Sequence, residues 1–232
     1  MSLHSSRATA LSSVLFCLLS VFLLVSIPRL LRGAELSPAE LAQALQLKYD
    51  GIRDFSADFV HTYRGGVLKK QLTERGRLLI KKPGKMRWEY RSPEEKLFVS
   101  DGVKLYSYIP QDKQVMVGTV PQENSATTPA LFLAGKGNLT RDFTASEGDL
   151  PAGLPAATRA LKLVPKAPQP EYDWLVLLVD SRTLALGGLV TTDAQGGTSS
   201  ILFENLKENV GLADQEFVFK IPRGVDVVTD AR

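Results

Sequence analysis

The sequence predicts a mainly β protein (α+β), a single unclosed antiparallel β-barrel with an N-terminal helix and a short lid helix covering its concave hydrophobic face. Three observations support this class. Many short segments alternate apolar and polar residues with the two-residue period of a half-buried strand. Turns rich in Gly and Pro separate them at the close spacing of a barrel or strongly curved sheet. Clear helical character is confined to the front of the chain and one segment in its middle.

Composition narrows the function classes. Of 28 basic residues, Arg7, Arg29 and Arg32 lie in the first 34 positions, which hold no acid, so the remainder balances the 25 acidic residues. A neutral body is not expected to bind nucleic acid, which requires a basic surface. The single cysteine, Cys17, precedes the body, and the body has one histidine, His61. The sequence therefore predicts no disulfide, no metal site and no cofactor.

Residues 1–34 have the features of a signal peptide. Arg7 supplies a positive start, residues 11–27 form an apolar run, and Gly33-Ala34 supplies small residues for cleavage. An uncleaved N-terminal anchor is the alternative, because the run is long enough to span a membrane and Arg29 and Arg32 follow it. Residues 35–232 are then one domain outside the cytoplasm, because no boundary is evident within them.

A helix is predicted over residues 36–49. Ser37 is a good N-cap, Pro38 suits the first helical position, and Glu40 completes a capping box. One apolar stripe follows at four-residue spacing and must pack on another element: Leu41, Leu45 and Tyr49.

A half-buried strand is predicted over residues 52–63, because its side chains alternate. One face is mainly aromatic: Phe55, Ala57, Phe59, His61 and Tyr63. His61 is interpreted as a partly exposed strand residue, since no nucleophile that it could activate lies nearby in the sequence.

The segment 77–108 organises the rest of the chain. Two strand patterns flank a Lys-Lys-Pro-Gly turn, and one set of alternating side chains from each strand is expected to form a common sheet face. This face carries Leu78, Ile80, Met86, Trp88 and Tyr90, with Lys82 at its rim. This face is either half of an ordinary sandwich core or a concave surface that holds a ligand. An Asp-Gly hairpin follows at residues 100–103. In the strands on either side of this hairpin, two alternating sets of side chains could equally well form the concave face. Leu97, Val99, Tyr106 and Tyr108 are assigned to the concave face because they carry aromatic rings; the alternative set is Phe98, Val103 and Leu105.

A short helix is predicted at residues 129–134, with Thr128 as N-cap, Pro129 at its start and Gly135 at its end. Its middle, Leu131, Phe132 and Leu133, is apolar on every side, which excludes a place on a solvated surface. It is either a permanently buried plug or a lid that moves as ligand enters.

Residues 67–72 lead into the segment 77–108. The other strands are predicted at residues 115–120, 138–143, 159–164, 174–179, 184–192 and 199–206, with a last strand carrying Phe217, Phe219 and Ile221. Residues 226–232 are expected to form a loose tail. The run 174–179 is continuously apolar, as in a strand covered on both faces. An enzyme is not expected, because Glu94 and Glu95 lie in a solvated turn and no Gly-rich phosphate loop is present.

Five segments carry a family resemblance: GRLLIKKPGKMRWEY, LFVSDGVKLYSY, TTPALFLAG, LVPK and FVFKIPRGVDV. In order and spacing they resemble the LolA family of periplasmic outer-membrane lipoprotein carriers over residues 36–228. The resemblance implies a monomeric periplasmic chaperone that takes triacylated lipoproteins from an inner-membrane LolCDE-type ABC complex and passes them to an outer-membrane LolB-type receptor. It also implies a latch before the proline, where a family Arg bonds the lid backbone. Here that residue is Lys82, which offers a point charge in place of a planar fork.

The expected lipid-binding cavity combines the faces above: Leu41, Leu45, Phe55, Phe59, Leu78, Ile80, Met86, Trp88, Tyr90, Leu97, Val99, Tyr106, Tyr108, Phe217 and Phe219. The expected lid residues are Pro129, Leu131, Phe132 and Leu133, with Lys82 as their latch. Two alternatives stay open at this point. One is a membrane-anchored or soluble periplasmic module that binds or senses lipids or other amphiphiles on the same fold, and the other is a structural module with a closed core.

Overall fold

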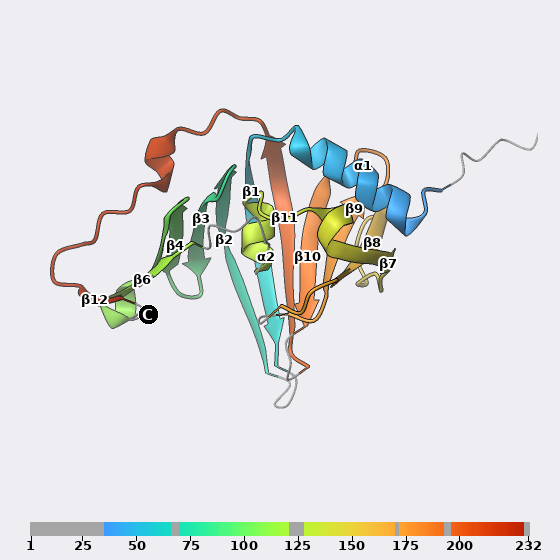
Figure 1. Ribbon diagram of the computed structural model, residues 1–232. Coiled ribbons are helices and arrows are strands. Elements are labelled where there is room, and N and C mark those ends of the chain that lie inside the picture. The colour runs from blue at the N-terminus through green and yellow to red at the C-terminus, as the bar shows by residue number, and fades with distance from the viewer. Residues whose placement is uncertain (1–34, 66–69, 121–127, 170–171, 193–195, 230–232) are drawn as a thin grey trace, which may run out of the picture. The chain divides into compact units, whose positions relative to one another are not determined.

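A computed structural model of the protein describes residues 35–65, 70–120, 128–169, 172–192 and 196–229 (Figure 1). The chain divides into two compact units, Met1–Glu35 and Leu36–Arg232, and the described residues beyond Glu35 belong to the second. The predicted signal peptide lies outside the described residues. Within them, none of the helices combines the length and hydrophobicity needed to span a bilayer.

The second unit is built on one 12-stranded sheet with the strand order β12-β6-β5-β4-β3-β2-β1-β11-β10-β9-β8-β7 (Figure 1). β12 and β7 lie at its two edges and do not pair with each other, so the sheet is unclosed, as predicted. The strands are β1 (Asp54–Arg64), β2 (Gln71–Lys81), β3 (Lys85–Ser92), β4 (Lys96–Asp101), β5 (Lys104–Ile109), β6 (Gln114–Thr119), β7 (Phe143–Glu147), β8 (Thr158–Pro165), β9 (Leu175–Asp180), β10 (Leu186–Thr192), β11 (Thr198–Glu208) and β12 (Asp226–Thr229). The β12–β6 pair is parallel, and the other pairs are antiparallel.

The N-terminal helix α1 (Pro38–Asp50) begins as the sequence predicts. Ser37 Oγ accepts a hydrogen bond from the backbone of Glu40, and the Glu40 carboxylate accepts one from the backbone of Ser37. These two bonds satisfy amides that have no partner within the helix. The predicted stripe of Leu41, Leu45 and Tyr49 is buried. The helix lies across the sheet near β7 and β8 (Figure 1).

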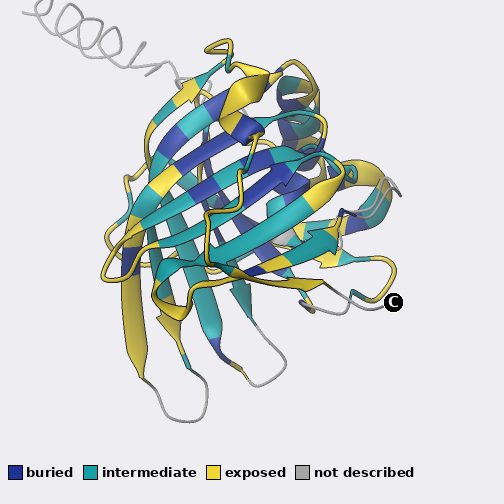
Figure 2. Ribbon diagram, turned by 90° about the vertical axis from the view of Figure 1, so that its left-hand side faces the viewer, coloured by how far each residue is buried: buried dark blue, intermediate teal, exposed yellow. Residues whose placement is uncertain are grey.

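The sheet has two differently covered faces, and β9 shows both. Leu175, Leu177 and Val179 join a large apolar cluster with α1, whereas Val176 and Leu178 join a small cluster on the opposite side. We call the first side the inner face and the second the outer face. The prediction that this strand is buried on both faces is confirmed. Figure 2 shows how buried and more exposed segments follow one another along the strands.

Two short helices follow β6, and one of them corrects the sequence analysis. α2 (Pro129–Leu133) is the predicted lid helix, capped by the Thr128 side chain. α3 (Leu139–Asp142) occupies residues that were expected to begin a strand, and β7 starts only at its end. The reason is Asn138, whose side chain accepts hydrogen bonds from the backbone of Thr140 and Arg141 and so starts a helical turn.

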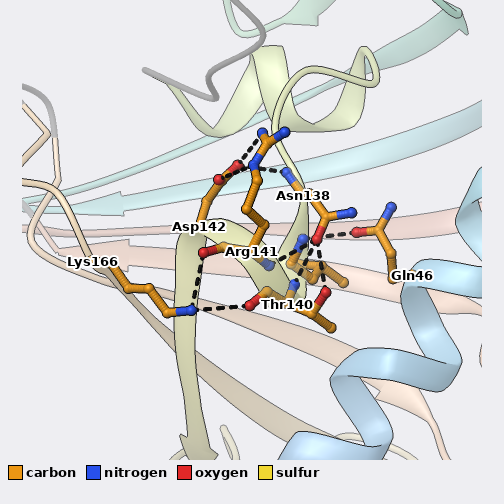
Figure 3. Close-up of polar contacts among 7 residues, drawn as sticks. Gln46, Asn138, Thr140, Arg141, Asp142 and Lys166 are labelled. Carbon is orange, nitrogen blue, oxygen red and sulfur yellow. Dashed lines mark hydrogen bonds and ion pairs between the residues drawn. The ribbon is translucent and has the colours of Figure 1, made fainter.

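Polar contacts fix α3 to its neighbours (Figure 3). The backbone amide of Leu139 donates to Gln46 Oε1 of α1 at 2.7 Å. Lys166 Nζ donates to the carbonyl oxygens of Thr140 and Arg141 at 3.1 and 3.0 Å. Lys166 therefore satisfies carbonyls at the end of this helix, where a cation is also favoured by the helix dipole.

The C-terminal region differs from the predicted last strand. Asp214–Phe217 form a 3₁₀ turn, η2, and residues 218–225 after it are not paired in the sheet. Asp214 bridges Lys81 and Lys85 at 2.6 and 2.9 Å, and Arg87 donates to the carbonyl of Glu216. Alternation at Phe217 and Phe219 therefore reflects side-chain packing and not strand pairing. The expected loose tail is also wrong, because β12 pairs with β6 over residues 226–229.

The strand register shows that the sequence analysis assigned the wrong set of side chains around the Asp-Gly hairpin to the concave face. Trp88 of the inner face is opposite Phe98, and Leu105 and Phe98 pack against the inner cluster. Leu97, Val99, Tyr106 and Tyr108 have the other parity and lie on the outer face. There Phe219 lies 5.3 and 5.7 Å from the rings of Tyr106 and Tyr108. The criterion of aromatic content failed because the C-terminal segment gives the outer face an aromatic covering of its own.

Candidate functional site

The inner face gathers most of the residues predicted to line a lipid cavity. They come from α1 and the first three strands, and each is at most 6% exposed: Leu41, Leu45, Phe55, Phe59, Leu78, Ile80, Met86 and Trp88. Tyr90 packs against them and is half-buried. Six predicted cavity residues lie elsewhere, on the outer face: Leu97, Val99, Tyr106, Tyr108, Phe217 and Phe219. Phe98 and Leu105 take their place, and correct strand parity would have found both.

Aromatic rings form a row across β1, β3 and β4 on the inner face. Phe59 contacts Trp88 and Tyr90 edge-on, at 5.3 and 4.9 Å between ring centroids, and Tyr90 contacts Phe98 at 5.8 Å. A Cβ built on Gly76 would clash with the backbone carbonyl of Glu89 in β3 and would lie 2.6 Å from the Phe59 ring. The glycine in β2 is thus required by the close approach of the β3 backbone and of the ring, and not by a turn.

The lid helix fills the inner face in this structure. Leu131, Phe132 and Leu133 are at most 5% exposed and belong to the inner cluster. Tyr49 of α1 stacks on Phe132 with ring centroids 5.5 Å apart and planes inclined by 15°. The described residues leave a shallow hollow between α1 and β10–β11, but none of its lining residues belongs to α2. This is a closed arrangement, in which the large side chains of α2 pack into the apolar cluster of the inner face.

Two hydrogen bonds hold the C-terminal end of the lid. The Tyr49 hydroxyl donates to the carbonyl of Leu133, and the amide of Gly84 donates to the carbonyl of Ala134 at 2.8 Å. These carbonyls end a helix and lack intrahelical donors. Burial raises the pKa of Tyr49 well above its usual value, so the hydroxyl keeps its proton for donation. The sequence places Tyr49 on the buried stripe of α1 but gives no signal that its hydroxyl reaches the lid.

Lys82 differs from its expected role in one respect. Its ammonium donates to the backbone carbonyl of Tyr49 and lies 3.8 Å from the centroid of that ring, so it bonds α1 and not the lid. Its aliphatic stem contacts the residue after the lid, because a Cβ built on Gly135 would lie 2.4 Å from Lys82 Cδ. Partial burial lowers the pKa of Lys82 to about 8, against the opposing effect of Asp50.

Ser100 supports the turn that holds the lid. This side chain is fully buried and donates from Oγ to the carbonyl of Gly84 at 2.8 Å. The same oxygen accepts a hydrogen bond from the amide of Gly102 at 3.1 Å. Ser100 therefore links the Asp-Gly hairpin to the turn whose Gly84 amide bonds the lid, and it is a functional candidate that the sequence analysis missed.

A polar cluster lies on the same face, at the hairpin end of β1 and β2. The largely buried carboxylate of Glu74 contacts Lys96 Nζ at 2.7 Å and His61 Nδ1 at 3.4 Å. His61 Nε2 lies 2.8 Å from the hydroxyl of Ser199, and Tyr90 Oη lies 3.2 Å from Nδ1. Burial lowers the pKa of His61, although the charge of Glu74 opposes this. The inner face is thus apolar near α1 and polar at its far end.

Fold and site together define a class: an open, mainly antiparallel sheet whose apolar inner face is closed by a helix and a short lid. A family profile described as "Outer membrane lipoprotein carrier protein LolA" matches residues 50–220. The chain belongs to the LolA family.

Curated relatives agree with this membership. An outer-membrane lipoprotein carrier protein of Chromohalobacter salexigens is 30% identical over 193 residues, covering 82% of this chain and 87% of its own length. One from Nitrosomonas europaea is 31% identical over 176 residues, covering 76% and 82%. Among solved structures, a LolA superfamily protein of N. europaea covers 77% of this chain and 95% of its own, at 16% identity and a TM-score of 0.44.

Proposed function

We propose that this protein is a periplasmic chaperone, and not an enzyme, that binds the acyl chains of lipoproteins against its inner face and carries them from the inner to the outer membrane. The observation that carries the proposal is the burial of the lid helix in the inner face. Three large apolar side chains, Leu131, Phe132 and Leu133, occupy the inner face although they belong to a helix of only five residues. Membership of the LolA family, whose curated members are named lipoprotein carriers, supports the same role.

The physical requirement for such a carrier is reversible burial. Each methylene that leaves water contributes about 0.8 kcal/mol, so acyl chains bind strongly to a dry apolar face. Release needs an opposing process. The lid supplies it, because its own apolar side chains can refill the inner face as the acyl chains leave. Loading then exposes Leu131–Leu133 and unloading buries them again, so part of the binding free energy is offset.

The lid is proposed to be latched through two residues in series. Lys82 fixes the end of α1 at Tyr49, and Tyr49 bonds the lid. Lys82→Leu is expected to leave loading intact and to impair transfer to an acceptor in a two-component assay, because the closed state that drives release is weakened. Normal transfer by this variant would leave Lys82 as a residue of the turn only.

The partners follow from this proposal. Triacylated lipoproteins are the cargo, an inner-membrane LolCDE-type ABC complex is the donor, and a LolB-type receptor, if present, is the acceptor for this monomeric carrier. Export depends on residues 1–34. The intact mass of the exported protein tests whether they are removed. A retained anchor would favour the alternative of a membrane-anchored amphiphile-binding or sensing module, since a shuttling carrier must leave the inner membrane.

The direct test is cargo recovery. The chain, purified from the periplasm, is expected to copurify with lipoproteins or their acylated peptides, identified by mass spectrometry. Hydrogen exchange of residues 128–135 is then compared with and without lipoprotein. Faster exchange in the loaded protein is expected because the lid leaves its seat. An empty preparation that also fails to extract lipoprotein from inner-membrane vesicles would contradict the proposed function.

A further inference from the structure

Trp88 holds a buried donor without an acceptor. The side chain is 6% exposed, and its indole Nε1 has no hydrogen-bond partner among the described residues. An indole N–H can only donate, so no change of protonation or tautomer can relieve this. Buried polar groups in folded proteins are nearly always paired, and one that is not requires an explanation.

The position of this donor on the inner face suggests the explanation. Trp88 is opposite Leu78 on one side and Phe98 on the other, and its ring contacts Phe59 at one end of the aromatic row. Toward α1 its nearest neighbours on the same face are apolar, among them Phe55, Ile80 and Met86. Toward the hairpin end it leads through Tyr90 to the polar cluster. The donor therefore lies at the border between an apolar and a polar zone.

An acylated lipid has the same order of groups. Hydrocarbon comes first, then a carbonyl in an ester or amide, then a polar head. We propose that the indole N–H of Trp88 donates a hydrogen bond to the ester or amide carbonyl that joins an acyl chain to the rest of the ligand. This inference rests on the proposed function, since the lid must leave the inner face before a ligand can reach Trp88. Trp88 then binds the ester or amide linkage of the ligand, whereas the apolar zone binds only its acyl chain.

Selectivity follows from this hydrogen bond. A ligand with a carbonyl satisfies the buried N–H, whereas an ether of the same length leaves it without a partner. Sites that hydrogen-bond a ligand discriminate against analogues lacking the group, because their buried polar atoms are left unpaired. Free hydrocarbon or ether lipid should therefore bind less tightly than the ester lipid, although it buries the same apolar area.

The test compares two glycerophospholipids with the same head group and chain length, one with ester and one with ether linkages. Binding is measured by displacement of a fluorescent fatty acid. The wild-type protein is expected to bind the ester lipid about tenfold more tightly than the ether lipid. Trp88→Phe should bind both lipids with the affinity that the wild type has for the ether. Trp174→Phe is the matched control, because Trp174 packs against the small outer cluster, and it should keep the preference.

A second measurement needs no substitution. The indole N–H resonance of Trp88 in the wild-type protein should move downfield with the ester lipid and not with the ether, whereas that of Trp174 should not respond. Equal binding of both lipids, or a preference that survives in Trp88→Phe, would overturn the assignment and leave the carrier function intact. Failure to bind either lipid would also overturn the assignment, and it would contradict the proposed function only if lipoprotein extraction from inner-membrane vesicles failed as well.

Discussion

Tyr49→Phe tests whether the hydroxyl of one residue keeps the lid closed. The substitution retains the ring that stacks on Phe132 and removes only the donor to the carbonyl of Leu133. That carbonyl lies at the end of α2, next to buried apolar residues, so it would lose its partner without gaining water. Leaving a buried acceptor unpaired costs about 1–3 kcal/mol. The lid should therefore open about 5- to 150-fold more often, at 1.4 kcal/mol per factor of ten.

Hydrogen exchange measures this opening directly in the absence of any ligand. The amides to follow are those of Phe132, Ala134, Gly135 and Lys136, each of which donates to a backbone carbonyl in or beside the lid. Their exchange reports the free energy of local opening. Tyr106→Phe is the control, because Tyr106 lies on the outer face beside Phe219. Wild-type exchange rates in Tyr49→Phe, at unchanged global stability, would refute the reasoning.

The same assay separates the roles of Tyr49 and Lys82. Lys82→Met keeps most of the aliphatic stem that contacts Gly135 and removes the ammonium. If Lys82 acts by holding Tyr49, adding Lys82→Met to Tyr49→Phe should accelerate exchange by less than it does in the wild type. Such non-additivity is the signature of residues that act on one contact. Fully additive effects would show instead that Lys82 holds the lid independently.

Three further predictions concern the inner face. Phe132→Ala should lower the melting temperature, because loss of a buried Phe costs about 3–5 kcal/mol, and should raise the affinity for a fluorescent fatty acid, because a smaller side chain has to leave the inner face. Leu178→Ala, in the outer cluster, is the control and should lower only the melting temperature. If Phe132→Ala does not raise the affinity, Phe132 is a permanent core residue and not part of a lid. Burial lowers the pKa of His61, so below about pH 6.5 the unfolded chain binds more protons at this residue than the folded chain does, and stability falls on acidification. The urea midpoint of His61→Gln should therefore fall less steeply than that of the wild type between about pH 7.5 and 5.5. Parallel curves for the two proteins would exclude His61 as the cause. Gly76→Ala would press a Cβ against the backbone carbonyl of Glu89 in β3 and place it 2.6 Å from the Phe59 ring, so it should destabilise the fold by about 1–3 kcal/mol in urea titrations. Wild-type stability would mean that both the β3 backbone and the ring can shift.

Local signals in the sequence were sufficient for much of the architecture. The capping box at Ser37, the Pro-Gly and Asp-Gly turns, and the period-two strands each depend on neighbours within a few residues, and the structure has them where predicted. The lid helix could be predicted for the same reason, since Thr128 and Gly135 mark its ends. The alternation of β1 to β3 also identified most of the buried inner residues correctly, because side-chain direction in a strand is fixed by the backbone.

The failures occur where distant contacts decide between local alternatives. Phe98 and Tyr106 belong to equally good alternating sets, and only the covering of each face shows which set is inside. Phe219 alternates like a strand residue but packs by its side chain alone, while the less suggestive tail forms β12 through pairing with β6.

The sequence by itself determined that this chain folds as an open sheet with an apolar face and a lid, because hydrophobic period, caps and turns are properties of neighbouring residues. Tertiary structure decided which residues close the lid. A hydroxyl at position 49 and a carbonyl at position 133 are 84 residues apart, and folding alone brings them together. The same holds for the Lys82 ammonium, which reaches α1 because the turn at Pro83 lies against the end of that helix.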